Sequence, residues 1–140
     1  MKVVPMPKKL ALKLEVFNPF CELIGLAFSR CKKGYSECIL EVNEKLLNPH
    51  KVLHGGVIYS MADTGMGMAL YPYLDEGELC ATVEIKIAYF RAIASGVVTC
   101  KTKLANKGKR IAALESEIEN DGCLIAKAMG TYSIFKVKED

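Results

Sequence analysis

The apolar residues between positions 56 and 70 recur at the spacing of a helix, and most of the remaining positions there are also apolar or small. The recurring residues are Val57, Ile58, Met61, Ala62, Gly65, Met68 and Ala69. This pattern predicts a helix from Gly56 to about Leu70 that is buried nearly all round. Pro72 and the turn at 75–77 are expected to end it.

After this helix the hydrophobic period changes to two, which predicts strands at 79–89, 98–104 and 112–119. A last strand is expected over 124–135. Turn residues separate these segments, at 106–108 and at Asp121-Gly122. Strict alternation from Leu79 to Tyr89 puts Thr82 on the same strand face as Glu84 and Lys86.

The first part of the chain is less regular. Residues 1–17 mix basic and apolar positions and are expected to form an N-terminal arm or a short helix. Asn18-Pro19 opens a short helix through Leu23, and strands are expected over 26–32 and 35–42. Residues 43–53 read as an irregular connection. The predicted fold is α+β: one domain over 18–140, with an antiparallel sheet wrapped around one long central helix.

Composition narrows the class of protein. The chain has 140 residues and a formal net charge of +3 at pH 7, which is too small to argue for nucleic acid. Lys8, Lys9 and Lys13 interrupt the apolar N-terminus, so no secretory signal is expected. Asp63 inside the most apolar segment argues against a membrane span. We therefore expect a cytoplasmic protein that binds neither nucleic acid nor membrane.

The six cysteines show no C-x-x-C spacing, and neither histidine lies near a cysteine pair. This argues against a zinc site, and no metal or cofactor is expected. The cysteines are interpreted as small buried hydrophobic residues of a reducing compartment. They are Cys21, Cys31, Cys38, Cys80, Cys100 and Cys123.

Asp63 is the strongest candidate for chemistry, because it is the only Asp, Glu, Lys or Arg between Val52 and Leu74. A carboxylate in such apolar surroundings must be paired, hydrogen-bonded or used in a reaction. The alternative is a partly exposed aspartate that bonds the backbone or faces a pore.

His54-Gly55-Gly56 stands where the helix is expected to begin. The first N–H groups of a helix have no internal acceptor, and the helix dipole favours negative charge there. Two glycines let a ligand approach this backbone closely, so the site can bind a carbonyl oxygen that becomes an oxyanion. The alternative is an ordinary glycine-rich helix start.

Gly55 and Asp63 are separated by about 12 Å along a helix that rises ~1.5 Å per residue. One substrate carbonyl group cannot easily reach both within one subunit, which predicts a dimer that joins the amides of one subunit to the aspartate of the other. Gly65 and Gly67 suggest close packing against the sheet or a partner helix. No G-x-S-x-G elbow or Walker loop occurs, whereas a cysteine paired with His54 is not excluded.

The run from Asn48 to Asp63, NPHKVLHGGVIYSMAD, resembles the signature of hotdog-fold acyl-CoA thioesterases of the phenylacetate-degradation (PaaI-like) type. The similarity extends over about 18–135 and includes Asn18-Pro19-Phe20, 81–84, 89–92 and the stretch from Asp121 to Tyr132. The resemblance implies a hotdog fold, homodimers that often pair into tetramers, and acyl-CoA bound across the dimer interface.

The same resemblance implies the roles of individual residues. Asp63 matches the general base or nucleophile, and Gly55 matches the residue whose amide binds the thioester carbonyl. Asn48 and His54 match residues that place water or substrate, and Thr82 falls where a hydroxyl often assists.

Candidate substrate-binding residues complete the prediction. Gly56 lies at the helix start, and four basic residues are expected at the rim to bind CoA phosphates. These are Arg91, Lys107, Lys109 and Arg110. The expected reaction is hydrolysis of acyl-CoA to free acid and CoA, with CoA only as part of substrate and product. The alternatives are a non-catalytic acyl-CoA sensor and a thioesterase for acyl-carrier protein.

Overall fold

A computed structural model describes residues 18–138 of the chain. The N-terminal arm predicted over 1–17 lies outside the described residues. A short helix α1 (Pro19–Ile24) precedes a hairpin of β1 (Leu26–Lys32) and β2 (Tyr35–Glu41), and a 3₁₀ turn η1 (Glu44–Leu46) follows. The long helix α2 (Gly55–Leu70) and a second 3₁₀ turn, η2 (Tyr71–Tyr73), come next. Four strands end the chain: β3 (Glu78–Tyr89), β4 (Val97–Lys107), β5 (Ile111–Asn120) and β6 (Cys123–Lys136).

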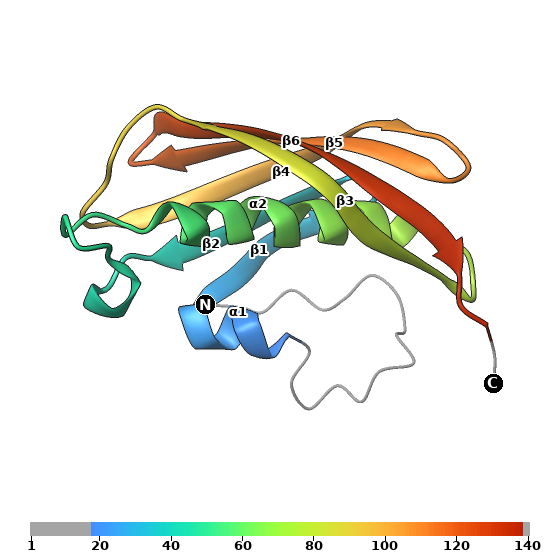
Figure 1. Ribbon diagram of the computed structural model, residues 1–140, viewed down its shortest axis with the longest axis horizontal. Helices are drawn as coiled ribbons and strands as arrows, with labels where there is room; N and C mark the ends of the chain where they lie inside the picture. Colours follow the sequence, from blue (N-terminus) through green and yellow to red (C-terminus); the bar gives the residue numbers. More distant parts are fainter. Residues whose placement is uncertain (1–17, 139–140) are drawn as a thin grey trace.

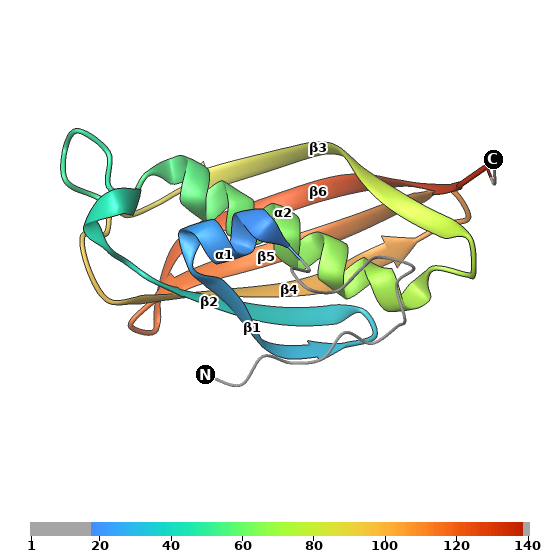
Figure 2. The same cartoon turned by 90° about the horizontal axis from the view of Figure 1, so that it is seen from below.

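The six strands form one antiparallel sheet in the order β1-β2-β4-β5-β6-β3. The sheet curves around α2, which lies along its concave face (Figure 1). Seen from below, α1 crosses α2 on the side away from the sheet (Figure 2). The predicted fold class, an antiparallel sheet wrapped around one central helix, is confirmed.

The close contact between α2 and the sheet is made at Gly65. A Cβ atom added there would lie 2.8 Å from Thr102 Oγ1, and the Gly65 carbonyl accepts a hydrogen bond of 2.6 Å from Ser36 Oγ. Thr102 Oγ1 also forms a hydrogen bond of 2.6 Å with Ser116 Oγ. The buried hydroxyls of Ser36, Thr102 and Ser116 therefore all have hydrogen-bond partners, either another hydroxyl or the helix backbone. The close approach expected at Gly65 is therefore to the sheet, whereas a Cβ at Gly67 would meet nothing within 4 Å.

Strand β3 departs from the predicted alternation. Its pairing with β6 shifts between Thr82 and Glu84, so that Val83 is an extra residue without a partner, a β-bulge. Thr82 then contacts α2 through Asp63, while Ile85 and Ile87 beyond the bulge pack against the core. The prediction that Thr82 shares a face with Glu84 and Lys86 is wrong, because the bulge reverses the alternation between the two halves of the strand.

Two smaller expectations also need correction. The turn expected at 106–108 begins later, because β4 continues to Lys107 and has its own register shift between Leu104 and Asn106. Only Cys21, Cys38 and Cys100 are buried, whereas Cys31 and Cys80 are half-buried and Cys123 is exposed beside the β5–β6 turn. Within 18–138 no helix has the length and apolar character needed to cross a membrane.

Candidate active site

Asp63 lies in the third turn of α2 and is half-buried. Two hydroxyl groups reach the same oxygen of its carboxylate. Thr82 Oγ1 donates to Oδ1 at 2.6 Å, and the Tyr132 hydroxyl donates to Oδ1 at 2.5 Å and to the Asp63 carbonyl at 2.8 Å. No ion pair within residues 18–138 involves Asp63, and Oδ2 has no hydrogen-bond donor in this part of the chain. The carboxylate is therefore held by neutral donors through one oxygen, and its other oxygen is open.

The sheet register brings the two hydroxyls together. Thr82 of β3 and Tyr132 of β6 are direct partners in the antiparallel ladder, so their side chains share one face of the sheet. That face is turned toward α2. The bulge at Val83 follows immediately, which is consistent with the common role of bulges beside functional sites, where they change the direction of a side chain.

Tyr132 is only 2% exposed. Burial raises the pKa of its hydroxyl far above the ordinary value, and the hydrogen bond to Asp63 raises it further. The hydroxyl therefore keeps its proton across the neutral range and acts toward Asp63 as a donor.

The start of α2 forms a second group of candidate atoms. His54 is the N-cap, and its Nδ1 accepts a hydrogen bond of 2.8 Å from the Gly56 amide. The Val57 amide bonds the His54 carbonyl at 2.9 Å. Within 18–138 the Gly55 amide has no acceptor, so it is the open N–H at this helix terminus. The Gly56 amide, by contrast, is engaged by His54, which limits the substrate-binding role expected for Gly56.

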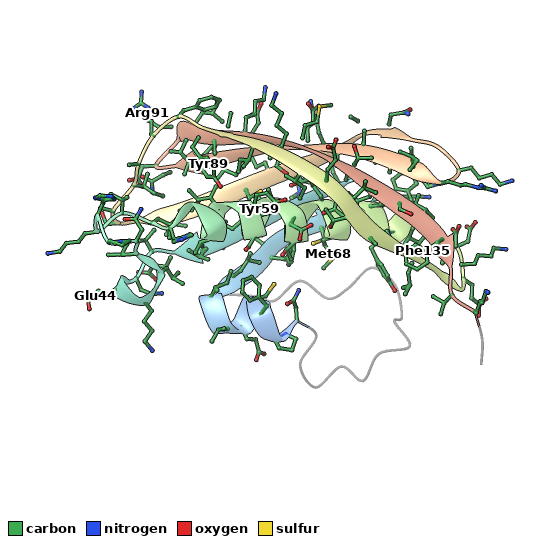
Figure 3. All side chains as sticks on the ribbon, viewed as in Figure 1. Glu44, Tyr59, Met68, Tyr89, Arg91 and Phe135 are labelled. Carbon is green, nitrogen blue, oxygen red and sulfur yellow. The ribbon has the colours of Figure 1, made fainter. Side chains whose placement is uncertain are left out.

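Tyr89 defines the position of the Gly55 peptide. Its hydroxyl donates to the Gly55 carbonyl at 2.7 Å, and a Cβ added to Gly55 would lie 3.2 Å from its ring. Figure 3 shows Tyr89 between the end of β3 and the start of α2. The tyrosine that packs against position 55 therefore favours glycine there, because a larger side chain would have to displace the ring.

Asn48 shapes the loop that leads to this helix start. Its Oδ1 accepts hydrogen bonds from the backbone amides of His50 at 2.9 Å and Val52 at 3.3 Å. Lys51 within the same loop has a φ of 61°, a conformation that these bonds help to hold. The Asn48 side chain thus organises the loop through its oxygen, which leaves its amide nitrogen for any contact with water or substrate.

The four basic residues expected at the rim do not come together in one chain. Arg91 borders a surface pocket of about 310 Å³ that is also lined by Gly55 and Tyr89. Lys107 ends β4, and Lys109 and Arg110 lie in the β4–β5 turn that follows, at the other end of the sheet (Figure 1). The 11 residues of β4 separate the two places by about 35 Å, at ~3.4 Å per residue.

Gly55 and Asp63 also remain apart, because α2 is continuous between them and spans about 12 Å over this interval. A single chain therefore presents two separate candidate half-sites: the carboxylate with its two hydroxyls, and the open amide with its pocket.

The sequence pattern does not predict that Tyr132 contacts Asp63 or that Tyr89 contacts Gly55. Both tyrosines occur in segments that carry the family resemblance, but the sequence pattern predicts only that Tyr89 belongs to an alternating strand and Tyr132 to the last strand. A tyrosine on the inward face of a strand is a usable signal, since a buried hydroxyl needs a hydrogen-bond partner.

Other kinds of site are less well supported. Among the described residues, no group of three or more His, Cys, Asp or Glu side chains is placed to hold a metal ion. Cys80 is the thiol that lies near Asp63. Burial raises its pKa, and the negative charge of Asp63 adds to the effect, so it remains a neutral thiol.

Comparison with known proteins identifies the family. The pattern of the thioesterase superfamily matches residues 50–126. A provisionally named esterase of Saccharolobus solfataricus is 32% identical over 123 residues, which cover 87% of this chain and 79% of the relative. The protein therefore belongs to the thioesterase superfamily, as the resemblance of its central motif predicted.

Further relatives place the chain within this superfamily. The medium/long-chain acyl-CoA thioesterase YigI of Salmonella typhimurium is 25% identical, covering 90% of this chain and 92% of its own. A thioesterase structure from Haemophilus influenzae has a TM-score of 0.81 and 26% identity, covering 94% and 96% of the two chains. A variant of the phenylacetic acid degradation protein PaaI of Thermus thermophilus has a TM-score of 0.78 and 26% identity, covering 83% and 98%. The chain has the hotdog fold of PaaI-like thioesterases, and its general activity is thioester hydrolysis.

Proposed function

We propose that the protein hydrolyses acyl-CoA thioesters to a free acid and CoA, in a site shared between two subunits. The observation that carries this proposal is the state of Asp63: a carboxylate without an ion pair among residues 18–138, held through Oδ1 and open at Oδ2. The name of the Salmonella relative, an acyl-CoA thioesterase, supports the choice of substrate class.

The proposed reaction assigns one role to each half-site. The thioester carbonyl oxygen binds the Gly55 amide, which stabilises the negative charge that develops on that oxygen during attack. As a general base, Asp63 takes a proton from water while the new C–O bond forms. The C–S bond then breaks, and the proton passes to the departing CoA thiolate.

Asp63 can also act as the nucleophile. Its Oδ2 then attacks the carbonyl carbon, the C–S bond breaks, and CoA thiolate leaves a mixed anhydride between Asp63 and the acyl group. Water hydrolyses this anhydride to the free acid and the original carboxylate, and the proton released in that step neutralises the CoA thiolate. Both routes consume one water and release the same products. The open Oδ2 suits either role.

A dimer is part of the proposal, because each chain holds only half of the required groups. Strand β3 forms an edge of the sheet beside Asp63, and it exposes Leu79, Val83 and Tyr89. A long edge strand with exposed apolar residues favours pairing with another strand. Pairing across this edge would bring a second α2 alongside the first, with the Gly55 end of one near the Asp63 of the other.

The dimer also affects how CoA is bound. We expect Arg91 of one subunit and the β4–β5 turn of the other to supply the phosphate contacts. A tetramer, a cytoplasmic location and a reaction without metal or cofactor remain predictions from the sequence.

The test is a substrate panel on the native protein and on Asp63→Asn. Native protein is expected to hydrolyse at least one acyl-CoA, and Asp63→Asn, which keeps the size of the side chain, is expected to lose at least ~100-fold in kcat. Melting temperature and binding of a non-hydrolysable acyl-CoA analogue control for folding. Near-native activity in the folded variant contradicts the proposed role of Asp63.

The same panel tests the alternatives. A sensor would bind acyl-CoA without hydrolysing it, and a carrier-protein thioesterase would prefer acyl groups on acyl-carrier protein over the same groups on CoA.

A further inference from the structure

The hydrogen bonds of Tyr132 make the two oxygens of the Asp63 carboxylate different from each other. We propose that Tyr132 is a positioning residue that, together with Thr82, holds Oδ1 of Asp63 so that Oδ2 is the oxygen that acts in thioester hydrolysis. This inference rests on the proposed function, since it assigns a role within the same site.

The Tyr132 hydroxyl contacts Asp63 at two points. It lies 2.5 Å from Oδ1 and 2.8 Å from the backbone carbonyl of the same residue. Thr82, on the neighbouring strand β3, places its Oγ1 2.6 Å from the same Oδ1. Two donors on separate strands therefore converge on a single oxygen.

The second contact of Tyr132 restricts how the carboxylate can turn. The terminal torsion of an aspartate is broad and roughly two-fold, so a carboxylate with one partner readily exchanges its two oxygens. Tyr132 joins Oδ1 to the backbone of the same residue, which ties the carboxylate plane to the helix. Rotation of the carboxylate out of this orientation would break the bonds to both hydroxyls, so one oxygen position stays held and the other stays open.

Tyr132 is itself immobile enough to serve this purpose. Its side chain is 2% exposed, and its residue is paired with neighbours on both sides, β3 and β5. Catalytic groups depend on orientation that is established before the reaction, so a rigid donor behind the carboxylate favours the reactive geometry.

A purely structural role makes a different prediction. A buried tyrosine hydroxyl needs one acceptor, and the Asp63 carbonyl alone would meet that need. If burial is the whole explanation, removal of the hydroxyl lowers stability and leaves turnover unchanged. If Tyr132 positions the carboxylate, turnover falls.

The experiment measures steady-state kinetics of the full chain with the acyl-CoA that the panel selects. Tyr132→Phe keeps the ring and removes the hydroxyl, and it is expected to lower kcat about 10-fold while KM changes less than about twofold. Tyr35→Phe is the matched control: its hydroxyl bonds Glu37 at 3.0 Å in the β1–β2 hairpin, and kcat should not change. Melting curves establish that both variants are folded at the assay temperature.

Tyr132→Phe combined with Asp63→Asn gives a second measurement. Asp63→Asn removes the reactive carboxylate oxygen, so the orientation that the hydroxyl imposes no longer affects turnover, and adding Tyr132→Phe should not lower the residual rate of Asp63→Asn further. A further 10-fold loss there would show a general effect on the fold and would overturn the proposal.

The outcomes separate this inference from the proposed function. Native kcat in Tyr132→Phe, with Asp63→Asn inactive, overturns the role of Tyr132 alone. Near-native activity in Asp63→Asn overturns the proposed function, and the positioning role with it. A 10-fold kcat loss in Tyr132→Phe that is absent in the Asp63→Asn background supports both.

Discussion

At the scale of single residues, the Thr82 hydroxyl is the contact whose contribution can be isolated most cleanly. Thr82 is exposed and donates to Asp63 Oδ1 at 2.6 Å, so its substitution changes a hydrogen bond without opening a cavity. Thr82→Ser keeps the hydroxyl and is expected to retain most activity. Thr82→Val keeps the shape and is expected to lower kcat by roughly 10-fold, or ~1.4 kcal/mol in the activation free energy.

Melting temperatures of the native, Ser and Val proteins provide the control, because an exposed hydroxyl contributes little to stability. Equal kcat values for all three would reduce Thr82 to a β-branched residue that fills a strand position.

At the scale of elements, Gly65 and Gly67 of helix α2 have different surroundings. A Cβ at Gly65 would lie 2.8 Å from Thr102 Oγ1, which is itself held by Ser116 and cannot easily move. Gly65→Ala is therefore expected to lower the free energy of unfolding by about 1–3 kcal/mol. Gly67→Ala meets no atom within 4 Å in a single chain and is expected to stabilise the helix by up to about 1 kcal/mol.

Urea unfolding of the two variants measures both changes. A similar effect of the two substitutions would contradict the contact described at Gly65. Analytical ultracentrifugation of Gly67→Ala adds a second result: a weakened dimer would place Gly67 in the contact between subunits, packed against a partner helix.

At the scale of the whole molecule, the separation of the two half-sites predicts complementation between subunits. Asp63→Asn removes the carboxylate, and Gly55→Val displaces the open amide because its side chain meets the ring of Tyr89. A heterodimer of the two contains one intact shared site. Random exchange in an equal mixture is expected to restore about a quarter of native activity, since half of the dimers are mixed and each has one working site.

Native mass spectrometry of the mixture shows whether subunits have exchanged, and each variant alone gives the background rate. Exchange without any recovery of activity would argue that each site is formed within one chain.

The local pattern of the sequence predicted the long helix and the strands, and it singled out Asp63 as the candidate for chemistry. The helix predicted from Gly56 to about Leu70 is observed as Gly55–Leu70, and the strand expected at 26–32 is observed with the same bounds. These predictions succeed because periodic burial is encoded residue by residue. Asp63 was recognisable from the local sequence as well, because it is the only charged residue in a segment that is otherwise apolar or small.

The partners of Asp63 were decided by the tertiary structure. Tyr132 lies 69 residues away in the chain and meets Asp63 because β6 pairs with β3 in one particular register. The inward direction of Thr82 depends on the bulge at Val83, and the alternating sequence of β3 gives no sign of an extra residue. Local pattern specifies which residues are buried, whereas strand order, register and bulges determine which hydroxyl meets which carboxylate.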